Sequence, residues 1–241
     1  MRRTAPTDPA ALDPESAPAS GQPLCSGFWG KLPGHGDFVG RGLPHDWVQA
    51  WDGWLQRGLA LAFDANGKAR LQAELALMPV WYFLARPPAG VDARPAVRPV
   101  CWCGLLASSH DRVGRLFPLT LVQAWPAADV ADFGAADQRI DRLRSLLPQA
   151  EAPGNADQLA DALRGLADLP TLAARADPCG SAVDVADAAS HGRSWWWRSG
   201  PHEPATRPLT QTLPQPQPQP QPQIQPWPPA DGWLAQLLAG R

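Results

Sequence analysis

The residues with the most chemical potential lie in GFWGKLPGHGDFVGRGLP, residues 27–44, where six glycines surround four charged or titratable side chains: Lys31, His35, Asp37 and Arg41. Glycines let backbone amides approach a phosphate closely, so we first test for a nucleotide-binding loop. A P-loop requires G-x-x-x-x-G-K-[ST], but Cys25 stands at the first glycine and Leu32 at the hydroxyl position. A dinucleotide loop requires G-x-G-x-x-G, and the residues after Gly36 do not fit it. The stretch matches neither loop.

A catalytic function for the same stretch is a second possibility. His35 and Asp37 could form an acid/base or metal-binding pair, and Lys31 or Arg41 could hold an anion. No nucleophile lies nearby, and a lone His and Asp in a glycine-rich loop more often hydrogen-bond to backbone groups. The alternative hypothesis is therefore an enzyme that binds a phosphate-containing ligand through the Gly27–Pro44 loop, with four functional side chains: Lys31, His35, Asp37 and Asp111.

Two other groups of reactive side chains are weaker candidates. The run from Ser108 to Asp111 contains the residue types of a catalytic triad, but a triad is assembled in space, and these types suit a polar turn between two apolar strands. Cys101 and Cys103 share a face of a predicted strand, yet no second Cys or His pair has the spacing of a zinc site. We expect no metal and no cofactor.

Length and composition limit the function classes. The 241 residues, of which 44% are hydrophobic and twelve are tryptophans, suffice for one well-packed domain. The net charge of -2 favours neither nucleic acid nor an anionic membrane as a partner. No apolar run reaches the roughly 20 residues of a membrane span, and the start of the chain lacks a secretory apolar region. We therefore expect a cytoplasmic protein without membrane insertion, and the sequence leaves its oligomeric state open.

Composition also divides the chain into four parts. Residues 1–23 hold five prolines and little apolar material, which is typical of disorder. Residues 24–213 carry the apolar patterning of the domain. Residues 214–229 begin with PQPQPQPQPQ, which favours an extended spacer. A weaker interpretation is that this tract binds to a groove on another protein that recognises proline-rich segments. Residues 230–241 resume with a short amphipathic helix that could dock on the domain, through four apolar side chains: Trp233, Leu234, Leu237 and Leu238.

The helical patterns in the domain predict four further segments. A helix begins after Pro44, and its inward stripe consists of Trp47, Trp51, Trp54, Leu55 and Leu59. A second covers about 68–78 and stops before Pro79. A third is capped by Asp129 and ended by Pro148, with five inward side chains: Phe133, Ala136, Ile140, Leu143 and Leu147. The fourth covers about 156–169 and buries Leu159, Leu163 and Leu166.

Segments rich in β-branched and aromatic residues predict a sheet. Residues 80–85, 97–109 and 115–125 indicate an antiparallel meander. FWGKL, residues 28–32, is predicted to be a buried strand followed by a Gly/Asp turn into the tryptophan-striped helix. Residues 193–199 are typical of a strand buried on both faces, and 208–213 could pair with it. The fold class is therefore α+β, with a central, mostly antiparallel sheet flanked by helices.

Three segments together resemble the TagF family of type VI secretion-associated proteins. They are residues 27–55, residues 111–120 with the sequence DRVGRLFPLT, and the SWWW run at 194–197. The GKLP, GDF, RGLP and DRVGR-FPLT elements are all present in this order. The resemblance covers about residues 26–200 and could extend to the final helix, while residues 1–23 and the Pro-Gln repeat lie outside it.

The resemblance implies a longin-like α/β/α sandwich and a cytoplasmic, non-enzymatic function. A protein of this family would repress type VI secretion post-translationally by binding a forkhead-associated scaffold protein of that machine. Some members are fused to a PP2C-type phosphatase domain, but this chain has neither the length nor the metal-binding aspartates for one. The glycine-rich stretch is then chiefly a scaffold that contributes to a partner-facing surface. We expect six partner-binding residues: Lys31, Asp37, Arg41, Asp111, Arg112 and Arg115.

Overall fold

The structure, a computed structural model, describes residues 22–86, 100–127, 130, 133–152, 156–166, 192–198, 223–226 and 229–239. These residues form a seven-stranded sheet in the order β2-β1-β5-β4-β3-β6-β7, and every neighbouring pair is antiparallel. The strands are β1 (Cys25–Gly30), β2 (Val39–Arg41), β3 (Trp81–Arg86), β4 (Val100–Ala107), β5 (Leu119–Pro126), β6 (Arg193–Arg198) and β7 (Gln223–Pro226). The predicted meander is present as β3, β4 and β5, which are neighbours in the sheet.

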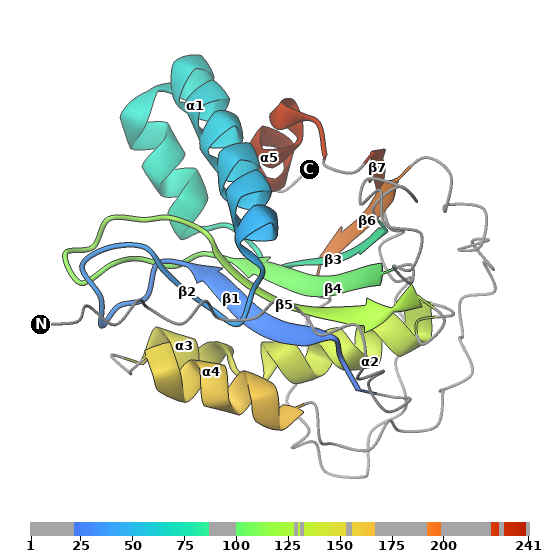
Figure 1. The fold of residues 1–241 in the computed structure, drawn as a ribbon. Coiled ribbons are helices and arrows are strands. Elements are labelled where there is room, and N and C mark those ends of the chain that lie inside the picture. The colour runs from blue at the N-terminus through green and yellow to red at the C-terminus, as the bar shows by residue number, and fades with distance from the viewer. Residues whose placement is uncertain are drawn as a thin grey trace, which may run out of the picture.

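Helices cover both faces of this sheet. The helices are α1 (His45–Ala76), α2 (Phe133–Arg144), α3 (Leu147–Glu151), α4 (Ala156–Gly165) and α5 (Asp231–Leu238). Figure 1 shows α1 and α5 on one side of the sheet and α2, α3 and α4 on the other. The predicted α+β class, with helices flanking a central antiparallel sheet, is confirmed.

The core is correspondingly divided into two apolar layers, one on each face of the sheet. Adjacent residues in a strand point to opposite faces, so Trp195 packs in the layer under α2 and α4, while Trp196 packs in the layer under α1 and α5. Both side chains are buried, and Trp197 is half-buried. The interpretation of this segment as a strand buried on both faces is confirmed.

Helix α1 is two helical segments joined at Gly67. This residue has φ 75° and ψ 168°, a conformation that glycine adopts without the steric cost of a Cβ. Figure 1 shows the two halves as a helical hairpin, in agreement with the two helical segments predicted on either side of it. Of the predicted stripe, Trp51, Trp54 and Leu55 are buried, and the other two members are half-buried.

The first predicted strand was placed too late, and a strand after it was missed. β1 ends at Gly30, so Lys31 and Leu32 belong to the following loop. The predicted Gly/Asp turn contains the three-residue strand β2, which pairs with β1. This close pairing depends on Gly42, because a Cβ there would lie 2.2 Å from the carbonyl oxygen of Ser26.

Two further boundaries were wrong for local reasons. β5 begins at Leu119 rather than at residue 115, because the preceding residues fold into a hydrogen-bonded loop. Helix α2 ends at Arg144, and Pro148 stands in the first turn of α3 instead of ending the preceding helix. Proline is tolerated there because the first turn leaves its N–H groups without helical partners. Asp129, the predicted cap of the helix seen as α2, lies outside the described residues. Residues 167–169, the predicted end of the helix seen as α4, also lie outside them, and Leu166, which was predicted to be buried, is half-buried.

The C-terminal part of the chain contributes to both the sheet and the core. β7 lies within the predicted spacer and pairs with β6, with Ser194 opposite Gln225. The segment 208–213, predicted to pair with the same strand, lies outside the described residues, as do residues 1–21 of the predicted disordered segment. Helix α5 packs against α1 and buries four side chains: Trp233, Leu234, Leu237 and Leu238. In the part of the chain that the structure describes, no helix combines the length and apolar character needed to cross a bilayer.

Candidate interaction site

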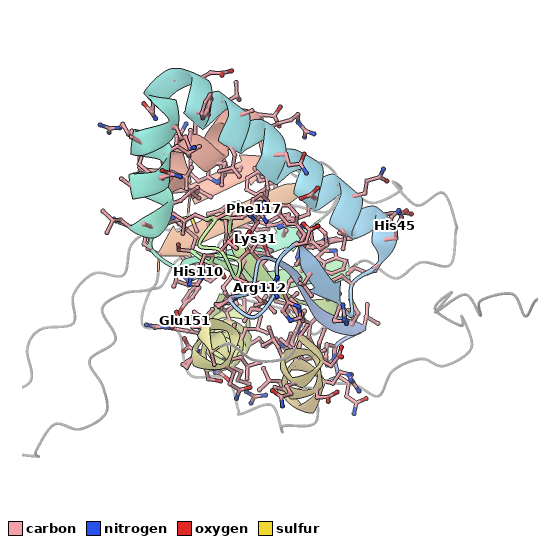
Figure 2. All side chains as sticks on the ribbon, turned by 90° about the vertical axis from the view of Figure 1, so that its left-hand side faces the viewer. Lys31, His45, His110, Arg112, Phe117 and Glu151 are labelled. Carbon is pink, nitrogen blue, oxygen red and sulfur yellow. The ribbon has the colours of Figure 1, made fainter. Side chains whose placement is uncertain are left out.

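Two loops meet at one end of the sheet, and we call them the loop pair. They are residues 31–38, between β1 and β2, and residues 110–117, between β4 and β5. The Arg112 N–H donates to the His35 carbonyl at 2.8 Å, and Arg115 Nη2 donates to the Gly36 carbonyl at 2.8 Å. Figure 2 shows labelled residues of both loops gathered between α1 and the helices of the opposite face. The loop pair therefore joins GKLPGHGDF to DRVGRLF, two segments far apart in sequence.

The carboxylate of Asp111 organises the loop pair. Its side chain is fully buried. Oδ2 accepts hydrogen bonds from Lys31 Nζ at 3.0 Å and Arg115 Nε at 2.6 Å. Oδ1 accepts from the backbone N–H groups of Val113 and Arg115 at 3.0 and 2.9 Å. A buried carboxylate is stable only when such donors replace water, so this set of contacts accounts for its position.

These contacts also fix the charge state of Asp111. Burial by itself would raise the pKa of this carboxyl group. The hydrogen bonds from the Arg115 N–H, the Lys31 ammonium, the Arg115 guanidinium and the Val113 N–H outweigh burial and hold the pKa well below its ordinary value of 3.8. Asp111 is therefore ionised at neutral pH and has little tendency to exchange a proton, which does not suit a general acid or base.

Replacing Asp111 by Asn should lower the melting temperature by several degrees at about pH 7, because Lys31 and Arg115 lose their shared anion. A depressed folded-state pKa stabilises the protein above the unfolded value, and this contribution fades as the pH falls towards the folded value. The difference between wild type and Asp111→Asn should thus be constant from about pH 7 to 5 and shrink below about pH 4. Thermal unfolding monitored by circular dichroism across this range measures it.

Asp37→Asn is the matched control for that experiment, since Asp37 is exposed in the same loop pair and should change the melting temperature little. A difference between wild type and Asp111→Asn that stays constant down to about pH 3 would contradict the assignment of the effect to the ionised carboxylate.

Lys31 faces the interior of the loop pair rather than solvent. Its side chain is 9% exposed, and Nζ donates to Asp111 and to the Arg115 carbonyl at 3.4 Å. The same ammonium lies 5.3 Å from the centroid of the Phe38 ring. Its donors are thus directed at groups of the chain itself, and binding a phosphate would require it to leave the Asp111 carboxylate.

The triad residue types are not arranged as a triad. Ser109 Oγ donates to the Lys31 carbonyl at 2.7 Å. His110 Nδ1–H donates to the Asp111 carbonyl at 2.9 Å, and the Asp111 carboxylate bonds to Lys31 and Arg115. A triad requires nucleophile, base and carboxylate to bond in series, so these contacts indicate a structural turn.

Two of the predicted functional residues hold helix α4 instead. The N–H of Ala156, the first residue of α4, donates to His35 Nε2 at 3.3 Å. Arg41 Nε pairs with Asp157 Oδ1 at 2.9 Å. Both side chains of this ion pair are substantially exposed, so its contribution to stability is about 0–1 kcal/mol. Arg41 is thus engaged on the α4 side, away from the Asp111 carboxylate.

The six predicted partner-binding residues therefore fall into three groups. Lys31 and Asp111 are buried, and Arg41 is paired to α4. The remaining three are exposed on the loop pair: Asp37, Arg112 and Arg115. Asp37 Oδ1 accepts a hydrogen bond from the Phe38 N–H at 2.8 Å, which stabilises the turn. Whether any of the six contacts a partner stays a prediction.

Sequence reasoning missed the apolar members of this surface. Phe38 is 38% exposed and Val113 is 68% exposed. The Phe38 ring stacks on Trp29 and meets Phe117 edge to face, with centroids 5.8 and 4.7 Å apart. Both residues lie inside the GDF and DRVGR elements of the sequence. The signal that could have found them is an apolar residue that directly follows a charged residue in a loop.

A metal or cysteine-based site finds no support in the described residues. They contain no group of three or more His, Cys, Asp or Glu side chains placed to hold a metal ion. Cys101 and Cys103 are buried free thiols, and the hydrogen bond with Cys101 together with burial holds the pKa of Cys103 well above its ordinary value. Cys179 lies outside the described residues.

Comparison with known proteins shows a match to a protein family and similarity to a solved structure. Residues 27–166 match the model of the TagF N-terminal domain, described as type VI secretion system-associated. Among solved structures, the chain is similar to PA0076 from Pseudomonas aeruginosa PAO1, with 29% sequence identity and a TM-score of 0.53. That similarity covers 78% of this chain and 100% of the other. Among curated proteins, none is similar enough to count as a match.

Proposed function

This chain belongs to the TagF family of type VI secretion-associated proteins, and from this premise we propose that it represses assembly of that secretion system. It acts in the cytoplasm, after synthesis of the components, by binding a forkhead-associated scaffold protein of the machine. It turns over no substrate. Its effect is therefore stoichiometric, and it depends on the affinity and concentration of the complex rather than on a rate of catalysis.

The observation that best supports a binding function is that the reactive side chains of the loop pair are engaged in hydrogen bonds within the chain. Lys31, Ser109 and Asp111 all direct their polar atoms at other groups of the chain. An enzyme requires a nucleophile, base or electrophile aimed at a space that a substrate can occupy. A rigid loop pair with exposed side chains at its surface suits a protein that acts by contact.

Calorimetric titration of the full chain with the forkhead-associated protein of the same bacterium tests this function. We expect saturable binding without added nucleotide or metal, together with reduced type VI secretion when the chain is overproduced in that bacterium. Absence of binding by a folded sample would overturn the proposed mechanism.

The enzyme hypothesis makes a different prediction, which a melting experiment can check. A ligand that binds only the folded state stabilises it, and the rise in melting temperature grows with the logarithm of the ligand concentration relative to the dissociation constant. A shift of several degrees with ATP, Mg²⁺ or Zn²⁺ would support a phosphate-ligand enzyme that uses the Gly27–Pro44 loop. For a protein that acts by contact alone, we expect no such shift.

A further inference from the structure

The outer surface of the loop pair is held rigid from within. Four donors converge on the buried Asp111 carboxylate, and two of them come from side chains on different loops, Lys31 and Arg115. Backbone hydrogen bonds from Gly114 N–H to the Asp111 carbonyl and from Phe117 N–H to the Ser109 carbonyl fix the second loop further, at 2.9 and 3.0 Å. A surface fixed before binding loses less conformational entropy when a partner docks.

This rigid frame holds two apolar side chains at the surface. Val113 occupies the tip of the second loop between Arg112 and Gly114, and it is 68% exposed. Phe38 is kept in place by Trp29 and Phe117, yet it remains partly exposed. Aromatic side chains are enriched at protein interfaces, so a partly exposed Phe38 that is held in one position suits a contact with a partner, with Val113 adding apolar area beside it.

Charge at the same surface is predominantly positive. Arg112 is exposed and has no ion pair or side-chain hydrogen bond with the part of the chain that the structure describes. The Arg115 side chain is 63% exposed although its Nε bonds to Asp111. The carboxylate of Asp111 is buried between two cations, so Asp37 is the exposed carboxylate of the loop pair.

We propose that the tip of the loop pair, formed by Phe38, Arg112, Val113 and Arg115, is the surface that binds the scaffold protein, through an acidic patch on that partner. This inference rests on the proposed function and identifies its contact face. A carboxylate of the partner pairs with Arg112, which has no such partner among the residues that the structure describes, while Val113 and Phe38 become buried against apolar side chains. Arginine suits this contact because its planar guanidinium binds a carboxylate through two hydrogen bonds.

The proposal also assigns different functions to the residues of one motif. In DRVGR, Asp111 organises the loop from within, Arg112 and Val113 contact the partner, and Arg115 does both. Removing Asp111 would therefore reduce binding only through the order of the loop. Changing Arg112 or Val113 would reduce binding with the fold unaffected, because both side chains project into solvent.

Titration of the scaffold protein with wild type, Arg112→Glu, Val113→Ser and Arg193→Glu tests the contact face. Arg193 is an exposed arginine at the other end of the sheet, so Arg193→Glu makes the same charge change away from the loop pair. We expect a loss of affinity of at least about tenfold for Arg112→Glu, a smaller loss for Val113→Ser and no change for Arg193→Glu. Wild-type affinity should also fall with added NaCl.

The outcomes separate the contact face from the function. Wild-type binding with equal affinities for Arg112→Glu and Arg193→Glu would overturn the contact face and leave the repressor function standing. Absence of wild-type binding would overturn the function, and the contact face would fall with it. Melting temperatures of all four proteins, measured in the same buffer, show whether each variant is folded.

Discussion

Removal of residues 223–241 is expected to abolish stable folding. Helix α5 buries four large apolar side chains against α1 and the sheet: Trp233, Leu234, Leu237 and Leu238. Burial of each contributes about 1.5–3 kcal/mol, so their loss removes about 6–12 kcal/mol. Because the whole free energy of unfolding of a domain is about 5–15 kcal/mol, little stability would remain.

Polar contacts along the same helix reinforce this expectation. Trp81 Nε1 donates to the Leu237 carbonyl at 3.0 Å, and Trp54 Nε1 donates to the Ala230 carbonyl at 3.4 Å. Gly58 lets the two helices approach closely, since a Cβ there would lie 2.6 Å from Leu234 Cβ. Truncation would also expose the edge of β6, where β7 now pairs.

Soluble yield and thermal unfolding by circular dichroism measure the effect of the truncation. The control is Asp231→Ala, which removes the exposed Arg57–Asp231 ion pair and should change the free energy of unfolding by less than about 1 kcal/mol. A truncated chain that unfolds cooperatively at the wild-type temperature would show that the fold is complete without its last helix.

The second large effect is expected for Trp196→Ala. Trp196 is fully buried and packs on three aromatic side chains: Trp51, Trp54 and Phe83. Truncation of a buried tryptophan to alanine typically costs about 3–5 kcal/mol, since contacts are lost and a cavity remains. Urea denaturation should show a lower midpoint with an unchanged slope.

Trp197→Ala is the matched control for this variant. The neighbouring tryptophan faces the other side of the sheet, is half-buried and meets Tyr82 edge to face. We expect a clearly smaller loss of stability for it. Equal losses for the two variants would contradict the assignment of Trp196 to the centre of the aromatic layer.

The sequence predicted those parts of the fold that rest on local patterns. In the tryptophan stripe of α1 and in the meander β3-β4-β5, the apolar residues recur with the spacing of a helix or a strand over many residues. The sequence pattern within each segment is therefore sufficient to predict these elements. β2 spans only three residues, of which the middle one is a glycine, and β7 lies in a Pro-Gln tract whose composition favours a spacer. Both strands depend on pairing with distant segments, which a local pattern does not record.

In the candidate site, too, the contacts between distant segments could not be predicted from the local sequence. Lys31 and Asp111 are charged residues in loops, and such residues are usually exposed, so the sequence placed both on the partner-facing surface. Their ion pair joins residues 80 positions apart, and it is this contact that buries both side chains. Phe38 and Val113 were overlooked for the converse reason, because apolar residues are expected to face the core.

The contact between α1 and α5 also bears on how the protein is made. Trp54 and its acceptor Ala230 are separated by 176 residues, so α1, which is complete at Ala76, stays uncovered by α5 until the nascent chain extends past Ala230. Contacts of such high order slow folding, and they leave apolar surface open while the ribosome is still translating. We therefore expect the tryptophan-rich face of α1 to be the part of the nascent chain most dependent on chaperones.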